Sequence, residues 1–380
     1  MKYFFSVLLF LFCALLFPLN VQAQETEQMT EIYKEQAEWS GADRLFSALD
    51  EDTQNALKNI GIDEVDTDLL SEIDAGKIFS EVIVLLQENS QTPLRCLGIC
   101  IGIMLLCALV EGSSLTLQEK SQNTVLSLVG TLALTSAIII PICQTIGRVC
   151  EVINGVSGFM LLYVPIMAGL MATAGQEISS ASYYGLMMTA GQSVSQISSK
   201  LIIPLLNIFL GISVTTAISP RMNLKAFCDT AYKVAKWVLS FVTALFVTLL
   251  TVQSLVTSSM DSVTNKTLRF AVSTFVPVVG SALGDALTTV SGSLKLLKSG
   301  AGVFAIIGAS FIFLPVLLEC FVWQITLFCT AAAGDLFGLK SLSGLLQAVS
   351  KVISMMIALL VCLMFVFVIT TVIILLVGRT

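Results

Sequence analysis

Apolar stretches long enough to cross a lipid bilayer recur through most of this chain of 380 residues. A membrane-spanning helix needs about 20 predominantly apolar residues. The strong stretches are residues 94–110, 124–143, 152–174, 201–218, 237–257, 300–318, 320–339 and 352–377. Two more are ambiguous: 178–197, which is rich in Ser and Gln, and 270–294, which contains Pro277 and Asp285. The pattern predicts an all-α, polytopic membrane helix bundle of about 8–10 membrane segments, and it leaves open whether one or two of these are re-entrant.

The few charged residues divide the chain into two unlike parts. Only 12% of the residues are charged, about half the value of soluble proteins, so much of the surface faces something other than water. Residues 24–92 hold 17 acidic and 4 basic residues, whereas residues 93–380 hold 9 and 15. Apolar residues in the first part have helical spacing. We therefore predict a small acidic helical region at 24–92, followed by a polytopic transmembrane domain at 93–380.

The first 23 residues have the pattern of a secretory signal peptide. Lys2 precedes an apolar run from Phe4 to Phe17, and the small-residue sequence Val21-Gln22-Ala23 follows. This pattern predicts cleavage after Ala23, with an uncleaved anchor as the alternative. In either case the region at 24–92 is expected to be extracytoplasmic.

The most basic loop, residues 219–236, is predicted to be cytoplasmic by the positive-inside rule. It contains Arg221, Lys225, Lys233 and Lys236 against Asp229 alone. With an external N-terminal region, an odd number of spans must precede this loop, and counting 178–197 as a span gives five. Counting 270–294 as well gives ten spans in all. That assignment places Lys295, Lys298, Lys340 and Lys351 inside and Arg379 outside.

Several classes of chemistry are excluded by what the sequence lacks. The chain contains no histidine, which rules out serine-histidine and cysteine-histidine catalysis and ligation of metal or haem by histidine. It has no G-x-x-x-x-G-K-[ST] string, so a partner would have to power any ATP-driven step. Cys96, Cys100 and Cys107 share one helix face and are interpreted as small apolar filling, with a metal-binding or redox-active face as the alternative. We expect no catalytic residue, cofactor or metal site.

A short repeat places two glutamines in the apolar region. Residues 169–179 reappear as residues 185–195, with eight of eleven positions identical. Their small residues allow close helix packing, and Gln176 and Gln192 can hydrogen-bond between helices. The alternative is that these glutamines line a polar conduit.

The segment from Phe275 to Gly300 combines helix breakers with charge inside an apolar stretch. An Asp at the centre of a membrane costs about 2.5–3.5 kcal/mol on insertion scales, so Asp285 requires a partner from another helix or water. Interrupted helices at membrane depth occur where they line a cavity or are buried in protein. The candidate residues for a conduit or helix break are Pro277, Gly280, Gly284, Asp285, Lys295, Lys298 and Gly300, with Gln176, Gln192 and Asp335 as secondary candidates.

The sequence Phe275-Val-Pro-Val-Val-Gly-Ser-Ala-Leu-Gly-Asp285, with Gly292, Lys298 and Gly300 after it, resembles the stage III sporulation protein AE family of endospore-forming bacteria. The signal sequence, acidic region and polytopic domain extend the resemblance over essentially the whole chain. It implies a permease-like protein of the mother-cell membrane around the forespore, the outer forespore membrane. It also implies partners: other membrane proteins of the stage III sporulation A operon, their ATPase and, indirectly, stage II sporulation protein Q. Nucleic acid is not among the expected partners.

Three functions follow as hypotheses. The first is a non-enzymatic membrane subunit of the channel or secretion-like complex between mother cell and forespore. The second is a stand-alone secondary transporter of a small solute, with its site near Asp285. The third is an intramembrane aspartyl protease in which Asp285 and Asp335 share a proton, although the Gly-x-Gly-Asp pattern is interrupted by Ala282.

Overall fold

All regular secondary structure in the described part of the chain is helical. The computed structural model describes residues 35–65, 74–114, 120–197, 200, 203–218, 225–275 and 280–376, and no strand occurs among them. The elements in chain order are η1 (Ala42–Leu45), α3 (Glu51–Asn59), α5 (Ala75–Ser114), α6 (Lys120–Thr173), α7 (Glu177–Ile197), α8 (Ile203–Ile218), α9 (Lys225–Phe275), α10 (Gly280–Leu336) and α11 (Lys340–Leu376). The predicted all-α class is confirmed.

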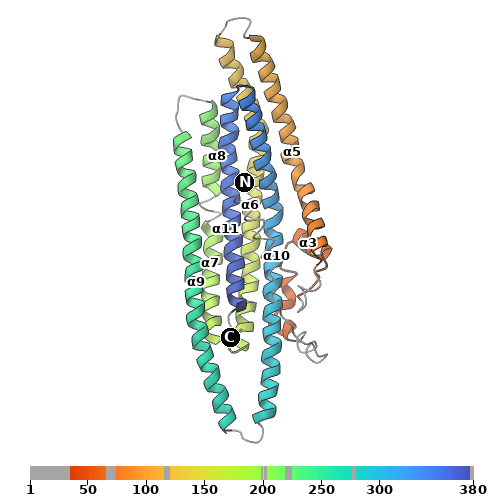
Figure 1. Cartoon of the computed structure of the whole chain (residues 1–380), viewed down its shortest axis with the longest axis vertical. Helices are drawn as coiled ribbons and strands as arrows, with labels where there is room; N and C mark the ends of the chain where they lie inside the picture. The colour runs from red at the N-terminus through yellow and green to blue at the C-terminus, as the bar shows by residue number, and fades with distance from the viewer. Residues whose placement is uncertain are drawn as a thin grey trace.

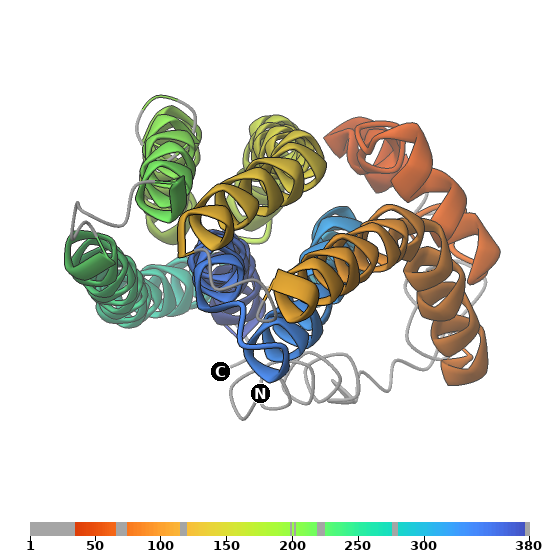
Figure 2. The ribbon, with the colours of Figure 1, turned by 90° about the horizontal axis from the view of Figure 1, so that it is seen from above.

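The long helices run up and down along one axis (Figure 1). Helices α7 and α8 follow each other in the same direction and together make one traverse of the bundle. Helix α11 lies among the others when the bundle is viewed along its axis (Figure 2), and it contacts α6, α8, α9 and α10. The pair α10 and α11 has the most extensive contact. Large side chains such as Trp323, Phe304 and Phe313 are fully buried in this core.

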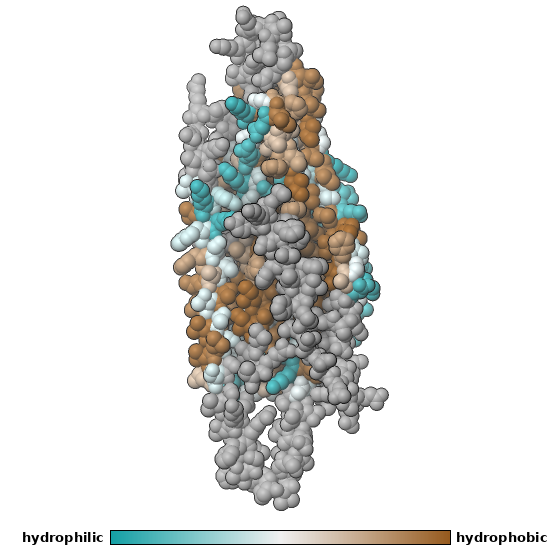
Figure 3. All heavy atoms as spheres, in the orientation of Figure 1, coloured by the Kyte–Doolittle hydropathy of each residue, from teal (hydrophilic) through white to brown (hydrophobic). Residues whose placement is uncertain are grey.

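Five described helices are long and apolar enough to cross a membrane, which confirms the polytopic prediction. They cover Ala75–Val110, Leu128–Thr173, Thr243–Asp261, Gly292–Leu336 and Lys340–Leu375, and a shorter apolar helix covers Ile203–Thr215. Hydrophobic residues line the visible face over much of its height (Figure 3). On α9 the apolar face points outward: Trp237, Phe241 and Leu249 are 67%, 53% and 55% exposed.

Separate apolar segments are fewer than predicted because some are joined in one helix. Residues 124–143 and 152–174 both lie in α6, which continues through Pro141 and Pro165. Residues 300–318 and 320–339 lie largely in α10, which continues through Pro315 and Glu319. The 57 residues of α10 extend about 85 Å at 1.5 Å per residue, longer than a whole bilayer is thick.

The continuity of α10 bears on one predicted placement of charge. Lys295 and Lys298 lie in its first half, whereas Lys340 follows its other end. The prediction that all three lie on the cytoplasmic side counted two spans between Lys298 and Lys340, whereas the structure has one continuous helix there.

The acidic N-terminal region packs its apolar residues against the bundle. Asp50 caps α3 by accepting a hydrogen bond from the backbone N–H of Thr53 (3.1 Å). The rings of Phe46 and Phe304 lie 6.2 Å apart, which places this region beside α10. Helix α5 then runs without a break through Pro93, so the predicted boundary at 92/93 lies inside a helix. The predicted signal peptide, 1–23, lies outside the described residues.

Two tight turns set the positions of the helices around the candidate site. Gly175 follows α6 with φ 80°, and Gly338 follows α10 with φ 77°. At the first turn the N–H of Gln176 bonds to the carbonyl of Met171 (2.8 Å) and that of Gly175 to Ala172 (3.0 Å). This is the Schellman arrangement, whose left-handed residue favours glycine. The turn reverses the chain so that α7 packs back along α6.

Candidate functional site: buried polar clusters between the helices

Two of the predicted candidates meet at the end of α6. Lys298, only 4% exposed in α10, donates a hydrogen bond from Nζ to Oε1 of Gln176 (2.9 Å). Gln176 is itself 6% exposed at the turn between α6 and α7. A buried ammonium group requires hydrogen-bond partners because its desolvation is costly. This contact therefore ties α10 to the α6–α7 turn.

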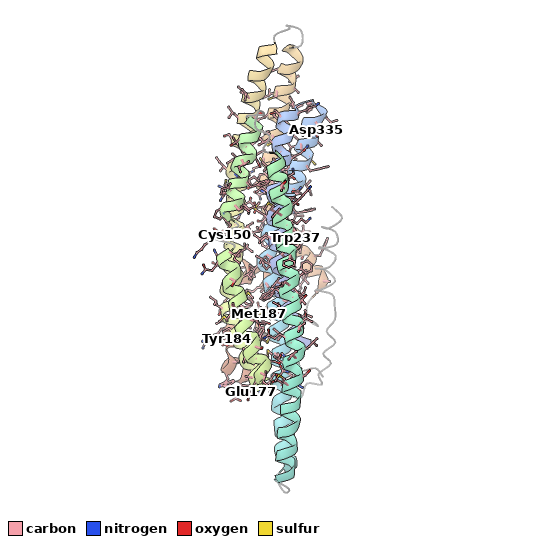
Figure 4. The ribbon with its side chains drawn as sticks, turned by 90° about the vertical axis from the view of Figure 1, so that its left-hand side faces the viewer. Cys150, Glu177, Tyr184, Met187, Trp237 and Asp335 are labelled. Carbon is pink, nitrogen blue, oxygen red and sulfur yellow. The ribbon has the colours of Figure 1, made fainter. Side chains whose placement is uncertain are left out.

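The first turn of α7 is held by a carboxylate from another helix. Asp261 of α9, 5% exposed, accepts hydrogen bonds from the backbone N–H groups of Ile178 and Ser179, both at 3.0 Å. The first N–H groups of a helix have no partner within it, and the helix dipole favours negative charge there. Glu177, in the same turn, is labelled near the lower part of the bundle in Figure 4. Sequence reasoning missed Asp261, whose signal was an acid just beyond the apolar stretch 237–257.

Hydroxyl and amide groups extend this polar cluster along α7. Ser180 Oγ donates to the carbonyl of Ala168 in α6 (2.6 Å). The side-chain amide of Gln253, in α9, donates to Ser182 Oγ. The beginning of α7 is thus hydrogen-bonded to α6 and α9, and the adjacent Gln176 to α10.

A second cluster centres on a buried carboxylate, Glu319 of α10, which is 1% exposed. Its Oε1 accepts hydrogen bonds from Thr145 Oγ1 (2.7 Å), from Arg148 Nη2 and from Trp323 Nε1 (3.3 Å). Its Oε2 is buried and has no hydrogen-bond partner among the described residues. The Arg148 side chain is 40% exposed, so the ion pair is buried on one side only.

The ion pair between Arg148 and Glu319 was also missed from the sequence. In the sequence analysis Glu319 separates two predicted spans, 300–318 and 320–339. The signal was an acid between two apolar stretches, and an intramembrane carboxylate indicates a function or a partner. The pair joins α6 to α10 between residues 171 positions apart in the chain.

The other predicted residues do not gather around these clusters. Pro277 lies outside the described residues, between the end of α9 and the start of α10. Gly280, Gly284 and Asp285 belong to the first turns of α10, and the side chain of Asp285 lies outside the described part. Further candidates are placed as follows: Lys295 is exposed on α10, Gly300 is buried, and Gln192 is helical in α7 with its side chain outside the description.

Asp335 lies near the C-terminal end of α10, toward the upper end of the bundle (Figure 4). It is exposed, as expected for an Asp at the end of a helix. Asp285 and Asp335 belong to the same helix, and fifty residues at 1.5 Å per residue separate them by about 75 Å. Two carboxylates that share a proton must be in contact. The aspartyl protease hypothesis is therefore wrong for a single chain.

The cysteines form no disulfide among the described residues. Cys96 and Cys100 are buried with their sulfur atoms 3.8 Å apart, and Cys107 is buried further along α5. Within the described part of the chain, no group of three or more Cys, Asp or Glu side chains is arranged to hold a metal ion.

Long apolar helices that cross the bundle up and down, joined by buried polar clusters, define an integral membrane protein of the polytopic helical class. Comparison with known proteins makes the assignment specific. The family model for Stage III sporulation protein AE (spore_III_AE) matches residues 64–378, and the chain belongs to this family.

Similarity to a curated member of the family is low but extended. The Stage III sporulation protein AE of Bacillus subtilis (strain 168) is 21% identical over 216 residues. These residues cover 56% of this chain and 53% of that protein, so the match spans about half of the curated relative. No solved structure matches the chain.

Proposed function

We propose that this protein is a non-enzymatic, permease-like subunit of the channel or secretion-like complex that joins mother cell and forespore. Its family membership and its five apolar helices support a membrane role in sporulation. The complex would contain the other membrane proteins of the stage III sporulation A operon and their ATPase, and it would reach stage II sporulation protein Q indirectly. The protein would lie in the outer forespore membrane.

The proposed orientation places the acidic N-terminal region outside the cytoplasm. Three traverses, α5, α6 and the pair α7–α8, precede the basic loop 219–236 (Figure 1). An odd number of crossings puts this loop on the cytoplasmic side, where the positive-inside rule favours it. Helices α9, α10 and α11 then return the C-terminal end to the external side.

The observation that carries the choice of a subunit over a stand-alone transporter is the close packing of the bundle. Two cavities between its helices have volumes of about 30 Å³ each. Such a volume holds one or two water molecules, well below the roughly 300 Å³ of a site for a small organic ligand. The small volume of these two cavities, which are lined by described residues, favours a path for cargo between chains.

A transport assay separates the two functions. The purified protein would be reconstituted alone into liposomes, and the flux of ions and small organic solutes would be compared with that of empty liposomes. We expect no solute flux above the control. Flux of a small organic solute through the protein alone, lost in a variant such as Asp285→Asn, would establish a stand-alone transporter.

A further inference from the structure

Helix α9 has an exposed face whose chemistry changes along its length. The helix lies at one edge of the bundle (Figure 2), where it packs against α7, α8, α10 and α11. Residues three and four positions apart share one face of a helix. Lys233, Lys236, Trp237 and Phe241 therefore lie on the same face, and all four are exposed. This face continues toward the C-terminal end of α9 as an aliphatic stripe.

The aliphatic stripe is about as long as the hydrocarbon core of a bilayer. Its side chains are 49–67% exposed and comprise Leu245, Leu249, Val252, Leu255, Val256 and Met260. From Phe241 to Met260 the helix rises about 29 Å, and the hydrocarbon core is about 30 Å thick. The next residue, Asp261, is buried and bonded to the first turn of α7. The stripe thus ends where the polar cluster around Gln176 begins.

The exposed hydroxyl groups beside this stripe are compatible with lipid. Thr248, Thr251 and Ser259 each donate to the backbone carbonyl four residues earlier, at 2.8, 2.8 and 2.9 Å. Lipid offers no hydrogen-bond partner to a polar group, so such a group must be satisfied within the protein. These three bonds meet that requirement.

The start of the face has the chemistry of a bilayer surface. Trp237 is 67% exposed, and its ring stacks on that of Phe241 with the centroids 5.4 Å apart. Tryptophan is enriched at the level of the lipid headgroups because its ring is amphipathic. Lys233 and Lys236 lie on the N-terminal side of this ring, in a segment with four basic residues and one acidic residue. Lysine, aromatic ring and aliphatic stripe follow one another as phosphate, interface and acyl chain do in a phospholipid.

The positive charge selects the type of headgroup. Lysine side chains near a membrane surface attract anionic lipids, whereas a zwitterionic headgroup has no net charge to neutralise. The stem of a lysine can lie along apolar surface while its ammonium group reaches the headgroup. Lys233 and Lys236 are one helical turn apart and can approach the same phosphate.

We propose that this face of α9 binds an anionic phospholipid, with its phosphate at Lys233 and Lys236 and its acyl chains along Trp237 and the aliphatic stripe. The leaflet rests on the proposed orientation, which places 219–236 on the cytoplasmic side, where anionic lipids are abundant. Headgroup binding is measured on the purified protein and does not depend on orientation or on partners. Its failure is therefore distinguishable from a failure of the proposed function.

Thermal unfolding of the full-length protein in detergent tests the headgroup preference. Phosphatidylglycerol and phosphatidylcholine with the same acyl chains would be titrated separately. A ligand that binds only the folded state raises the Tm as its concentration passes its Kd. We expect a saturable rise in Tm with phosphatidylglycerol and a much smaller rise with phosphatidylcholine. Equal responses to the two lipids, or no response to either, would overturn the proposal.

Matched variants locate the effect on α9. Lys233→Gln combined with Lys236→Gln should weaken the apparent affinity for phosphatidylglycerol about thirtyfold, because two attractive charges are lost. Replacement of both lysines by arginine should preserve the affinity. The control, Lys295→Gln combined with Lys340→Gln, removes two exposed lysines of α10 and α11 and should leave the response unchanged. An unchanged affinity in the α9 glutamine variant would overturn the assignment to this face.

Cross-linking in sporulating cells distinguishes a lipid from a protein on this face. A photo-reactive amino acid would be placed at position 249, within the aliphatic stripe, and its adducts identified by mass spectrometry after illumination. We expect adducts with phospholipid. A reproducible adduct with a polypeptide, whether a partner protein or a second copy of this chain, would show that protein covers the face and would overturn the proposal.

Discussion

At the scale of single residues, the buried charges are the most informative feature of this protein. Gln176 was singled out from the sequence by the repeat and Lys298 by the segment from Phe275 to Gly300, and the structure brings them together at 2.9 Å. Glu319 and Arg148 are charged residues between apolar stretches, but they were missed. A lone acid between two apolar stretches looks the same in the sequence whether it lies in a loop or inside a continuous helix. Only the structure, in which Arg148 is paired with Glu319, distinguishes the two cases.

The pair Glu319 and Arg148 should stabilise the protein as a unit. Glu319→Gln should lower the free energy of unfolding by about 1–3 kcal/mol, since it removes the charge but keeps an acceptor for Thr145 and Trp323. Arg148→Gln should cost less because its side chain is 40% exposed. Denaturation of the single and double variants would measure the coupling, with Glu151→Gln on the exposed side of α6 as control. Additive effects within about 0.5 kcal/mol would contradict the interaction.

Replacement of Asp285 and replacement of Asp335 should have different effects on sporulation, although each residue follows a glycine. We expect Asp285→Asn to insert into the membrane normally and to block sporulation, because Asp285 belongs to the glycine- and proline-interrupted segment that carries the family resemblance. Asp335→Asn is the matched control, since Asp335 is exposed at a helix end. Counts of heat-resistant spores and membrane levels of each variant are the measurements. Normal sporulation with Asp285→Asn would disprove the role of this residue.

At the scale of elements, sequence repetition does not mean structural repetition. In the first copy of the repeat, Gly175 has φ 80° and ends α6, whereas the second copy, residues 185–195, continues within α7. The difference lies in long-range partners: Asp261 and Lys298 bind only the first copy among the described contacts. Local sequence thus predicted helices on both sides but not which glycine ends one.

The close approach of α10 and α11 depends on Gly302. A Cβ atom there would lie 2.5 Å from Leu375 Cδ2 and 3.0 Å from its Cγ. Gly302→Ala should therefore displace the Leu375 side chain from its place against α10 and destabilise the protein by about 1–3 kcal/mol. Gly344→Ala on α11, which meets nothing within 4 Å, should be neutral or slightly stabilising because alanine favours the helix. Equal Tm values for the two variants would show that this packing is not tight.

At the scale of the whole molecule, the class and the approximate path of the chain were predictable, but the number of traverses was not. Hydropathy finds candidate membrane-crossing stretches because a helix needs about 20 predominantly apolar residues to cross the bilayer. It does not show whether two neighbouring apolar stretches form two helices or one, as in α6 and α10. That choice depends on packing between distant helices.

The up-and-down order of the helices makes a topological prediction. In a functional variant without native cysteines, Ser219→Cys should be protected from a membrane-impermeant maleimide added outside, because the proposed orientation places 219–236 on the cytoplasmic side. Glu177→Cys, at the opposite end of α7–α8, should be labelled. Disruption of the cells is the control that exposes both positions. The reverse pattern of labelling would invert the orientation.

The central claim is that this protein acts as a membrane subunit of a sporulation complex, and isolation of the complex tests it most directly. The tagged protein would be purified in mild detergent from sporulating cells after cross-linking, and its partners identified by mass spectrometry. We expect the other membrane proteins of the stage III sporulation A operon to be recovered in reproducible ratios, against a tagged unrelated membrane protein as control. Recovery of the protein alone, from cells in which it supports sporulation, would contradict the claim.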